Sequence, residues 1–133
     1  MDGKQQKLIF VVDDDPMFQS MLKDHLADNN PHFNVMGFLS GEDCLEHLSQ
    51  KPDAVILDYF LDNVEEDAAN GLEILKQIKD QYPEMPVVML SAQHRYGVAA
   101  QTLIEGAYYY IIKDDDAFEK VNEMINELLE EAV

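Results

Sequence analysis

Hydrophobic residues are concentrated in five short runs along the chain, and longer segments of mixed character separate these runs. Each run is rich in β-branched or aromatic residues and has the length of a strand buried on both faces of a parallel sheet. The runs occupy residues 8–12, 33–38, 54–57, 87–90 and 108–112. We therefore predict five buried strands.

The segments between the runs have the hydrophobic period of an amphipathic helix. Apolar residues recur three and four positions apart within residues 18–26, 72–78 and 118–129. Ser40 stands before Gly-Glu-Asp, which is typical of a helix N-cap. Strands that alternate with helices favour right-handed βαβ units, so we predict an α/β fold with helices on both faces of a parallel sheet.

The composition is that of one folded domain. The chain has 133 residues, of which 47% are hydrophobic and 27% are charged, and this is enough apolar material for a substantial core. No Gly/Ser/Pro-rich linker and no internal repeat divides the sequence. We expect residues 1–133 to form a single domain.

The charge narrows the range of partners. Nine Lys and Arg residues face 27 Asp and Glu residues, which gives a formal net charge of −18. Binding to nucleic-acid phosphates needs a basic face, so this charge argues against it, and against an anionic membrane surface. No apolar stretch is long enough to span a bilayer, and the first seven residues, MDGKQQK, contain no signal sequence. Together with the lone Cys44, these features favour the cytoplasm.

Polar side chains follow several predicted strands at the point where each strand ends. Asp13 and Asp14 follow the first run, Asp58 follows the third, Ser91 the fourth and Lys113 the fifth. Taken singly, an Asp or Ser there is usually a helix cap and a Lys is usually solvated. Ligands of open α/β sheets bind at the carboxyl ends of the strands, however, so the five together indicate a site.

Carboxylates gathered at one sheet edge need a compensating cation. Two of them about 4 Å apart repel each other by roughly 4 kcal/mol at an effective dielectric constant near 20. A few oxygen ligands with retained waters suit Mg²⁺. We therefore expect a magnesium site at this edge.

The order of these pieces resembles the receiver domain of two-component response regulators, of the chemotaxis-protein type. The matching segments are residues 11–15, 55–58, 89–92 and 106–113, and the resemblance covers nearly the whole chain. It implies a flavodoxin-like fold whose five-stranded parallel sheet has the order 2-1-3-4-5.

The resemblance also implies roles for the acidic residues. Asp58 would be the phosphoacceptor, taking a phosphoryl group from a histidine kinase or a histidine phosphotransfer protein. Asp14 and Asp58 would bind Mg²⁺ directly, together with the backbone carbonyl of Phe60, and Asp13 would act through a bound water. Physical chemistry agrees, because phosphoryl transfer depends mainly on positioning and charge neutralisation.

Three further residues receive roles from the resemblance. Lys113 would pair first with Asp58 and then with the phosphoryl oxygens. The Ser91 hydroxyl would donate to the phosphoryl group. Tyr110 resembles the aromatic switch residue whose rotamer changes when Ser91 moves.

The sequence departs from the family near the phosphoacceptor. The loop after Asp58 is long and acidic over residues 62–67, and a solvated loop or a partner-docking role fits it better than calcium binding. Asp114 replaces the usual proline after Lys113, so we predict a trans bond there, with Lys113 still reaching Asp58.

In the family that the chain resembles, two positions tune how water reaches the phosphoryl group. Here they hold Phe60 and Gln93, and the resemblance implies that a bulky Phe60 hinders the water. An aspartyl-nucleophile phosphatase is an alternative reading, but such an enzyme would have an Asp where Phe60 stands. A degenerate receiver that serves only as a binding module would have lost one of the key residues, and none is lost.

The expected function is that of a phosphorylation-controlled switch rather than an enzyme, apart from its own phosphorylation and dephosphorylation. Output would pass to an unknown protein through the family's usual face, here residues 96–105, 108–112 and 118–129. The eight acids among the last twenty residues favour a basic partner. The alternative that the chain is a receiver from a longer regulator stays open.

Overall fold

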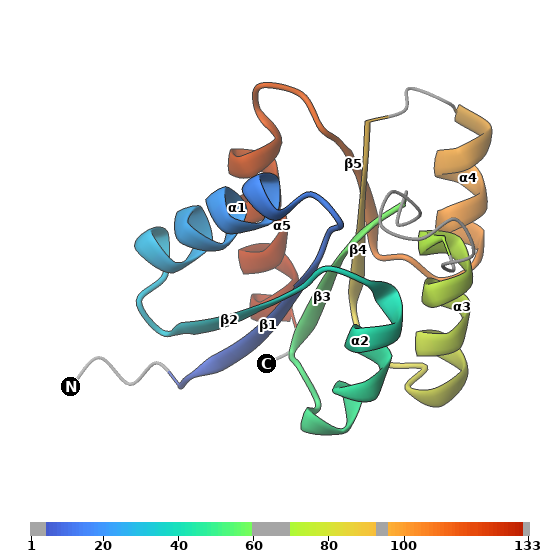
Figure 1. The fold of residues 1–133 in the computed structure, drawn as a ribbon, viewed down its shortest axis with the longest axis horizontal. Helices are drawn as coiled ribbons and strands as arrows, with labels where there is room; N and C mark the ends of the chain where they lie inside the picture. The colour runs from blue at the N-terminus through green and yellow to red at the C-terminus, as the bar shows by residue number, and fades with distance from the viewer. Residues whose placement is uncertain (1–4, 60–69, 93–95, 132–133) are drawn as a thin grey trace.

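The computed structural model describes residues 5–59, 70–92 and 96–131. Five parallel strands alternate with helices along the chain (Figure 1). In order, the elements are β1 (Lys7–Val12), α1 (Pro16–Asn29), β2 (Phe33–Phe38), α2 (Gly41–Glu46), a short 3-10 helix (Leu48–Gln50), β3 (Ala54–Asp58), α3 (Gly71–Gln81), β4 (Val87–Ser91), α4 (Tyr96–Ile104), β5 (Tyr109–Ile112) and α5 (Ala117–Glu131).

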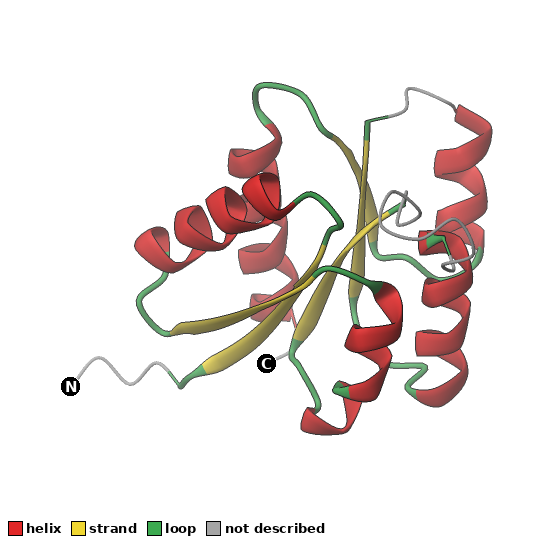
Figure 2. Cartoon of the chain, in the orientation of Figure 1, coloured by secondary structure: helices red, strands yellow, loops and turns green. Residues whose placement is uncertain are grey.

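The strands form one sheet in the order β2-β1-β3-β4-β5, which is the order that the resemblance to receiver domains implies. Helices α1 and α5 cover one face, whereas α2, α3 and α4 lie on the other (Figure 2). Because all four strand pairs are parallel, the carboxyl ends of the five strands lie at the same edge of the sheet.

Burial of both sheet faces explains why the strands are continuous hydrophobic runs. Along β1, Ile9 and Val11 pack on the side of α1 and α5, whereas Phe10 and Val12 pack on the side of α2 and α3. All four are at most 1% exposed. The alternation follows from the two-residue period of a strand.

The helix ends agree with the capping signals in the sequence and refine one boundary. The Ser40 hydroxyl accepts the backbone N–H of Asp43 at 3.2 Å, which confirms Ser40 as the N-cap of α2. The last helix begins at Ala117, one residue before the periodic segment 118–129, and the turn before it is closed by the Asp114 carboxylate, which accepts the N–H of Asp116 at 2.9 Å. The fifth strand likewise begins at Tyr109.

A cluster of three amide side chains joins α1 to α5. Asn30, which is buried, donates to the side-chain oxygen of Asn122 at 2.7 Å and accepts from Asn126 at 3.2 Å. Asn30 also donates to the carbonyl of Leu26 at 2.8 Å. The cluster fixes the C-terminal end of α1 against the middle of α5.

Two smaller observations bear on the expectations from composition. Cys44 is fully buried, and this burial raises the pKa of its thiol to about 12. Within the described residues, no helix has both the length and the apolar character that crossing a bilayer requires.

Candidate functional site

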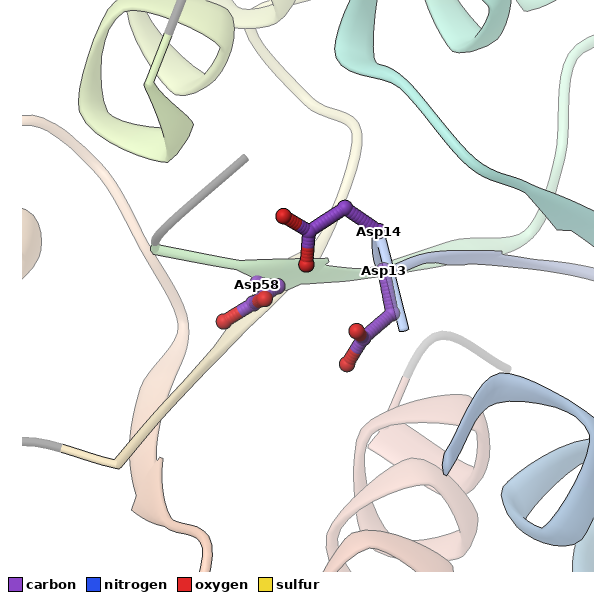
Figure 3. Close-up of side chains that lie close together, drawn as sticks. All are labelled: Asp13, Asp14 and Asp58. Atoms are coloured by element: carbon purple, nitrogen blue, oxygen red, sulfur yellow. The ribbon is translucent and has the colours of Figure 1, made fainter. Parts of the chain in front are cut away.

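Three buried carboxylates converge at the carboxyl edge of the sheet (Figure 3). Asp13 and Asp14 follow β1, and Asp58 is the last residue of β3. One oxygen of each lies within 4.8 Å of the others, and none of the three residues is more than 6% exposed. The sequence prediction that these residues meet is therefore confirmed.

Strand register explains the convergence. In the parallel pair β1–β3, Val12 lies opposite Leu57, so the residues that follow, Asp13 and Asp58, leave the sheet side by side. The Asp13 N–H donates to the carbonyl of Phe38 at 3.0 Å, which extends the ladder beyond β2 and holds Asp13 at the edge.

The ammonium group of Lys113 lies beside these carboxylates. Its Nζ is 2.8 Å from Oδ2 of Asp13 and 3.4 Å from Oδ2 of Asp58. Burial lowers the pKa of Lys113, but the two carboxylates outweigh burial and leave that pKa above its ordinary value. Lys113 thus reaches Asp58 as predicted, although its shorter ion pair is with Asp13.

A backbone hydrogen bond between the ends of β4 and β5 positions Lys113. Its N–H donates to the carbonyl of Ser91 at 2.8 Å, so β4 fixes the end of β5. The described peptide bonds are all trans, including the bond from Lys113 to Asp114, as the sequence predicts.

Asp13 is suited to binding a cation. Its Oδ1 accepts the N–H of Asp15 at 2.9 Å, whereas its buried Oδ2 has no hydrogen bond within the described part of the chain and only the Lys113 ammonium at ion-pair distance. Burial raises the pKa of Asp13, and this effect outweighs the lowering by Lys113 and by the N–H of Asp15. The all-oxygen donor set of three converging carboxylates fits Mg²⁺.

Of the remaining predicted site residues, the structure describes Ser91 and Tyr110. Ser91 is fully buried at the end of β4, the strand next to β3. Tyr110 is half-buried and packs against the core cluster on the α2 and α3 side. Phe60 and Gln93 lie outside the described residues, as does the acidic segment 62–67.

Gly71 is a site residue that the sequence analysis missed. Its N–H donates to the carbonyl of Tyr59 at 2.7 Å and closes the base of the long loop. A Cβ on Gly71 would collide with the carbonyl oxygen of Asp58 and would lie 2.6 Å from the Cα of Tyr59. Glycine therefore lets α3 begin directly against the backbone of Asp58. The sequence does not predict this contact, because twelve residues separate Asp58 from Gly71.

Phe18 is the second missed residue. The Nζ of Lys113 lies 4.4 Å from the centroid of the Phe18 ring, within the range of a cation–π interaction. The helical period identifies Phe18 only as an inward-facing residue, because periodicity does not show which side chain meets it.

Comparison with known proteins agrees with this architecture. The family model described as "Response regulator receiver domain" matches residues 9–126. An NtrX-like response regulator of Rickettsia felis is 37% identical over 106 residues, which are 79% of this chain and 21% of that protein. The DNA-binding transcriptional regulator NtrC of Escherichia coli K12 is 31% identical over 118 residues, which are 88% of this chain and 24% of that protein. The chain thus spans about a quarter or less of these curated relatives.

Solved structures show the same fold. The receiver domain of NtrX from Brucella abortus has a TM-score of 0.76 and 30% identity, covering 90% of this chain and 98% of that one. The BeF3-activated DrrB receiver domain has a TM-score of 0.82 and 27% identity, covering 95% of this chain and 99% of that one. Together with the family match, this shows that the chain belongs to the response regulator receiver domains, the phosphorylation-controlled switches of two-component systems.

Proposed function

We propose that Asp58 is the phosphoacceptor of this receiver domain, and that a histidine kinase or a histidine phosphotransfer protein supplies the phosphoryl group. The observation that carries the proposal is the convergence of Asp13, Asp14 and Asp58 with the ammonium of Lys113 at one buried sheet edge. Asp58 stands at the end of the strand that lies centrally in the sheet.

Phosphoryl transfer to Asp58 forms one bond to phosphorus and breaks another. A carboxylate oxygen of Asp58 forms a bond to phosphorus, and the bond from phosphorus to the donor's histidine nitrogen breaks. The electron pair of that bond leaves with the imidazole, which takes a proton from solvent. The nucleophile needs no general base, because a carboxylate is already ionised at neutral pH.

The negative charge of the site has to be neutralised before a phosphoryl group can bind. Three carboxylates and one ammonium leave two formal negative charges in excess before the phosphoryl group arrives. Asp14 and Asp58 would hold Mg²⁺ directly, with the carbonyl of Phe60, and Asp13 would hold it through a water. Bound Mg²⁺ would supply charge neutralisation for the phosphoryl oxygens.

Two other side chains would complete the switch. Lys113 would neutralise the phosphoryl oxygens from its place beside Asp58. Ser91, at the end of the neighbouring strand, would donate its hydroxyl to the same group, and Tyr110 would change its rotamer in response. Phe60 and Gln93 would control how water reaches the phosphorus.

The output would pass to another protein through α4, β5 and α5. Exposed apolar side chains on this face support the assignment: Ile104 is 77% exposed, and Leu103 and Tyr109 are each nearly half exposed. The adjoining C-terminal segment is strongly acidic, so a basic protein surface is the favoured partner. With a net charge of −18, the domain itself would bind neither nucleic acid nor an anionic membrane. Residues 1–133 would act as a single domain, and they would do so in the cytoplasm.

The proposal is tested by incubation with Mg²⁺ and a small-molecule phosphodonor, followed by intact mass measurement. The parent should gain the mass of one phosphoryl group, and Asp58→Asn should gain none. Asp53→Asn is the matched control, because Asp53 stands just before the same strand and its carboxylate accepts the backbone N–H of Leu8 at 2.8 Å, away from the three converging carboxylates. Equal phosphate uptake by Asp58→Asn and the parent would refute the role of Asp58.

A further inference from the structure

The Lys113 ammonium has an aromatic contact in addition to its two carboxylate contacts. Within the described residues, Nζ lies 2.8 Å from Asp13, 3.4 Å from Asp58 and 4.4 Å from the centroid of the Phe18 ring. The three partners come from β1, β3 and α1, and the lysine itself follows β5. The ring therefore closes the side of the ammonium that faces α1.

Phe18 is held firmly in this place. It is the third residue of α1, and its N–H donates to the capping carboxylate of Asp15 at 3.3 Å. Its ring packs edge-on against Phe118 of α5, with 5.3 Å between centroids and 60° between planes. The helix cap thus holds the backbone of Phe18, and the contact with Phe118 orients its ring.

A lysine at this position needs such a restraint. Its ammonium sits on a flexible four-carbon stem and is strongly hydrated, so ion pairing alone leaves other rotamers open to it. The Lys113 side chain still has 18% of its surface exposed. An aromatic face attracts the cation electrostatically and displaces water from one side of it.

We propose that Phe18 is a positioning residue for phosphorylation, because its ring face holds the Lys113 ammonium between Asp13 and Asp58. This inference rests on the proposed function of Lys113. The effect of Phe18 on phosphoryl transfer is indirect and passes through the lysine. Loss of the ring face should therefore slow phosphoryl transfer without abolishing it.

The test compares Phe18→Leu with Phe18→Tyr. Leu keeps an apolar contact with Phe118 but removes the ring face, whereas Tyr keeps the ring. With saturating Mg²⁺ and a small-molecule phosphodonor, we expect Phe18→Leu to be phosphorylated about five- to thirtyfold more slowly than the parent, a range set by the strength of buried cation–π pairs. Phe18→Tyr should restore the rate to within about twofold of the parent.

A spectroscopic signature separates positioning from packing. In NMR spectra of the parent, the Hε protons of one lysine should be shifted upfield by the ring current, and Lys113→Met should remove that signal. Phe18→Leu should return the Lys113 Hε signal to the range of the other lysines, and Phe18→Tyr should keep it shifted.

The outcomes separate the inference from the proposed function. Failure of the parent to take up phosphate, or uptake by Asp58→Asn at the parent rate, would overturn the proposed function. Phosphorylation of Asp58 in the parent with an equal rate in Phe18→Leu would overturn the role of Phe18 alone. An unshifted Lys113 Hε signal in the parent would also overturn the role of Phe18. This measurement does not depend on whether a Phe18 variant folds.

Discussion

Lys113 and Asp13 form the shorter of the two ion pairs that Lys113 makes with described residues, with 2.8 Å between Nζ and Oδ2. The corresponding distance from Lys113 to Asp58 is 3.4 Å. The ammonium of Lys113 thus lies nearer to Asp13, and Asp14 and Asp58 are close neighbours of like charge. This arrangement leaves an excess of negative charge for a divalent cation to neutralise.

Mg²⁺ should therefore stabilise the folded protein. Because the carboxylates converge only in the native state, the cation binds that state selectively, and at a hundred times its dissociation constant it should add about 2.7 kcal/mol to the free energy of unfolding. Thermal unfolding at increasing Mg²⁺ concentration measures this effect. A melting temperature that is independent of Mg²⁺ would show that the three carboxylates do not form a metal site.

Asp14→Asn should separate metal binding from structural stability. The substitution removes one of three carboxylates whose oxygens lie within 4.8 Å of one another, and such a pair repels by roughly 3.5 kcal/mol at an effective dielectric constant of 20. We expect weaker Mg²⁺ stabilisation and an apo protein at least as stable as the parent. A clear loss of apo stability by urea unfolding would instead identify Asp14 as a structural residue.

Gly71→Ala should disturb both stability and phosphorylation. The new Cβ would collide with the carbonyl oxygen of Asp58, and backbone atoms cannot move aside as a side chain can. We expect a loss of about 1–3 kcal/mol in the free energy of unfolding and slower phosphorylation of Asp58. Gly41→Ala is the comparison, because the nearest atoms to its Cβ would belong to the side chain of the buried Ile74 and not to the backbone of Asp58. It should lose stability but keep the parent rate of phosphorylation. Unchanged phosphorylation in Gly71→Ala would show that α3 does not position Asp58.

Much of the site was predictable because parallel strands all point their carboxyl ends to one edge. Asp13, Asp14, Asp58 and Lys113 follow strands that are evident as hydrophobic runs, so their meeting follows from topology. Which carboxylate lies nearer Lys113 was not predictable, because side-chain rotamers decide that distance.

Contacts between helices that are far apart in the sequence were also not predictable. Phe18 and Phe118 are both apolar positions of helices, and the period shows only that they face inward. Asn30 and Asn126 lie 96 positions apart and pair only because α1 and α5 cover the same face of the sheet. Polar residues at such positions carry no signal of their partner in the sequence.

The amide cluster leads to a prediction about stability alone. Asn30→Ala removes a buried side chain that bonds Asn122 and Asn126, leaving their polar groups without this partner, and it should cost about 1–3 kcal/mol. Asn29→Ala, one residue earlier and exposed, should cost much less. Urea unfolding measures both. Equal costs for the two variants would show that the cluster contributes no specific stability.

Cys44 leads to a pH prediction. Burial raises its pKa from 9.0 to about 12, so the folded protein keeps a proton that the unfolded chain loses above pH 9. Stability from this group is fully present below pH 9 and is lost as the pH rises toward 12. By linkage, the free energy of unfolding at pH 10 should fall by about 1.4 kcal/mol more in the parent than in Cys44→Ala.

Thiol labelling gives an independent check on the same residue. The native protein should react slowly with a thiol reagent at pH 8, because the thiol is both buried and protonated. Labelling at the rate of a free cysteine in the folded state would place Cys44 at the surface and contradict the core packing of α2.

The most direct measurement locates the phosphoryl group on the chain. The parent protein, phosphorylated by a small-molecule donor in the presence of Mg²⁺, is fragmented and the modified residue is identified by mass spectrometry. The account predicts that the phosphoryl group is on Asp58, at the end of β3 and beside Lys113. A phosphoryl group found instead on Asp13, on Asp14 or within the acidic segment 62–67 would contradict it.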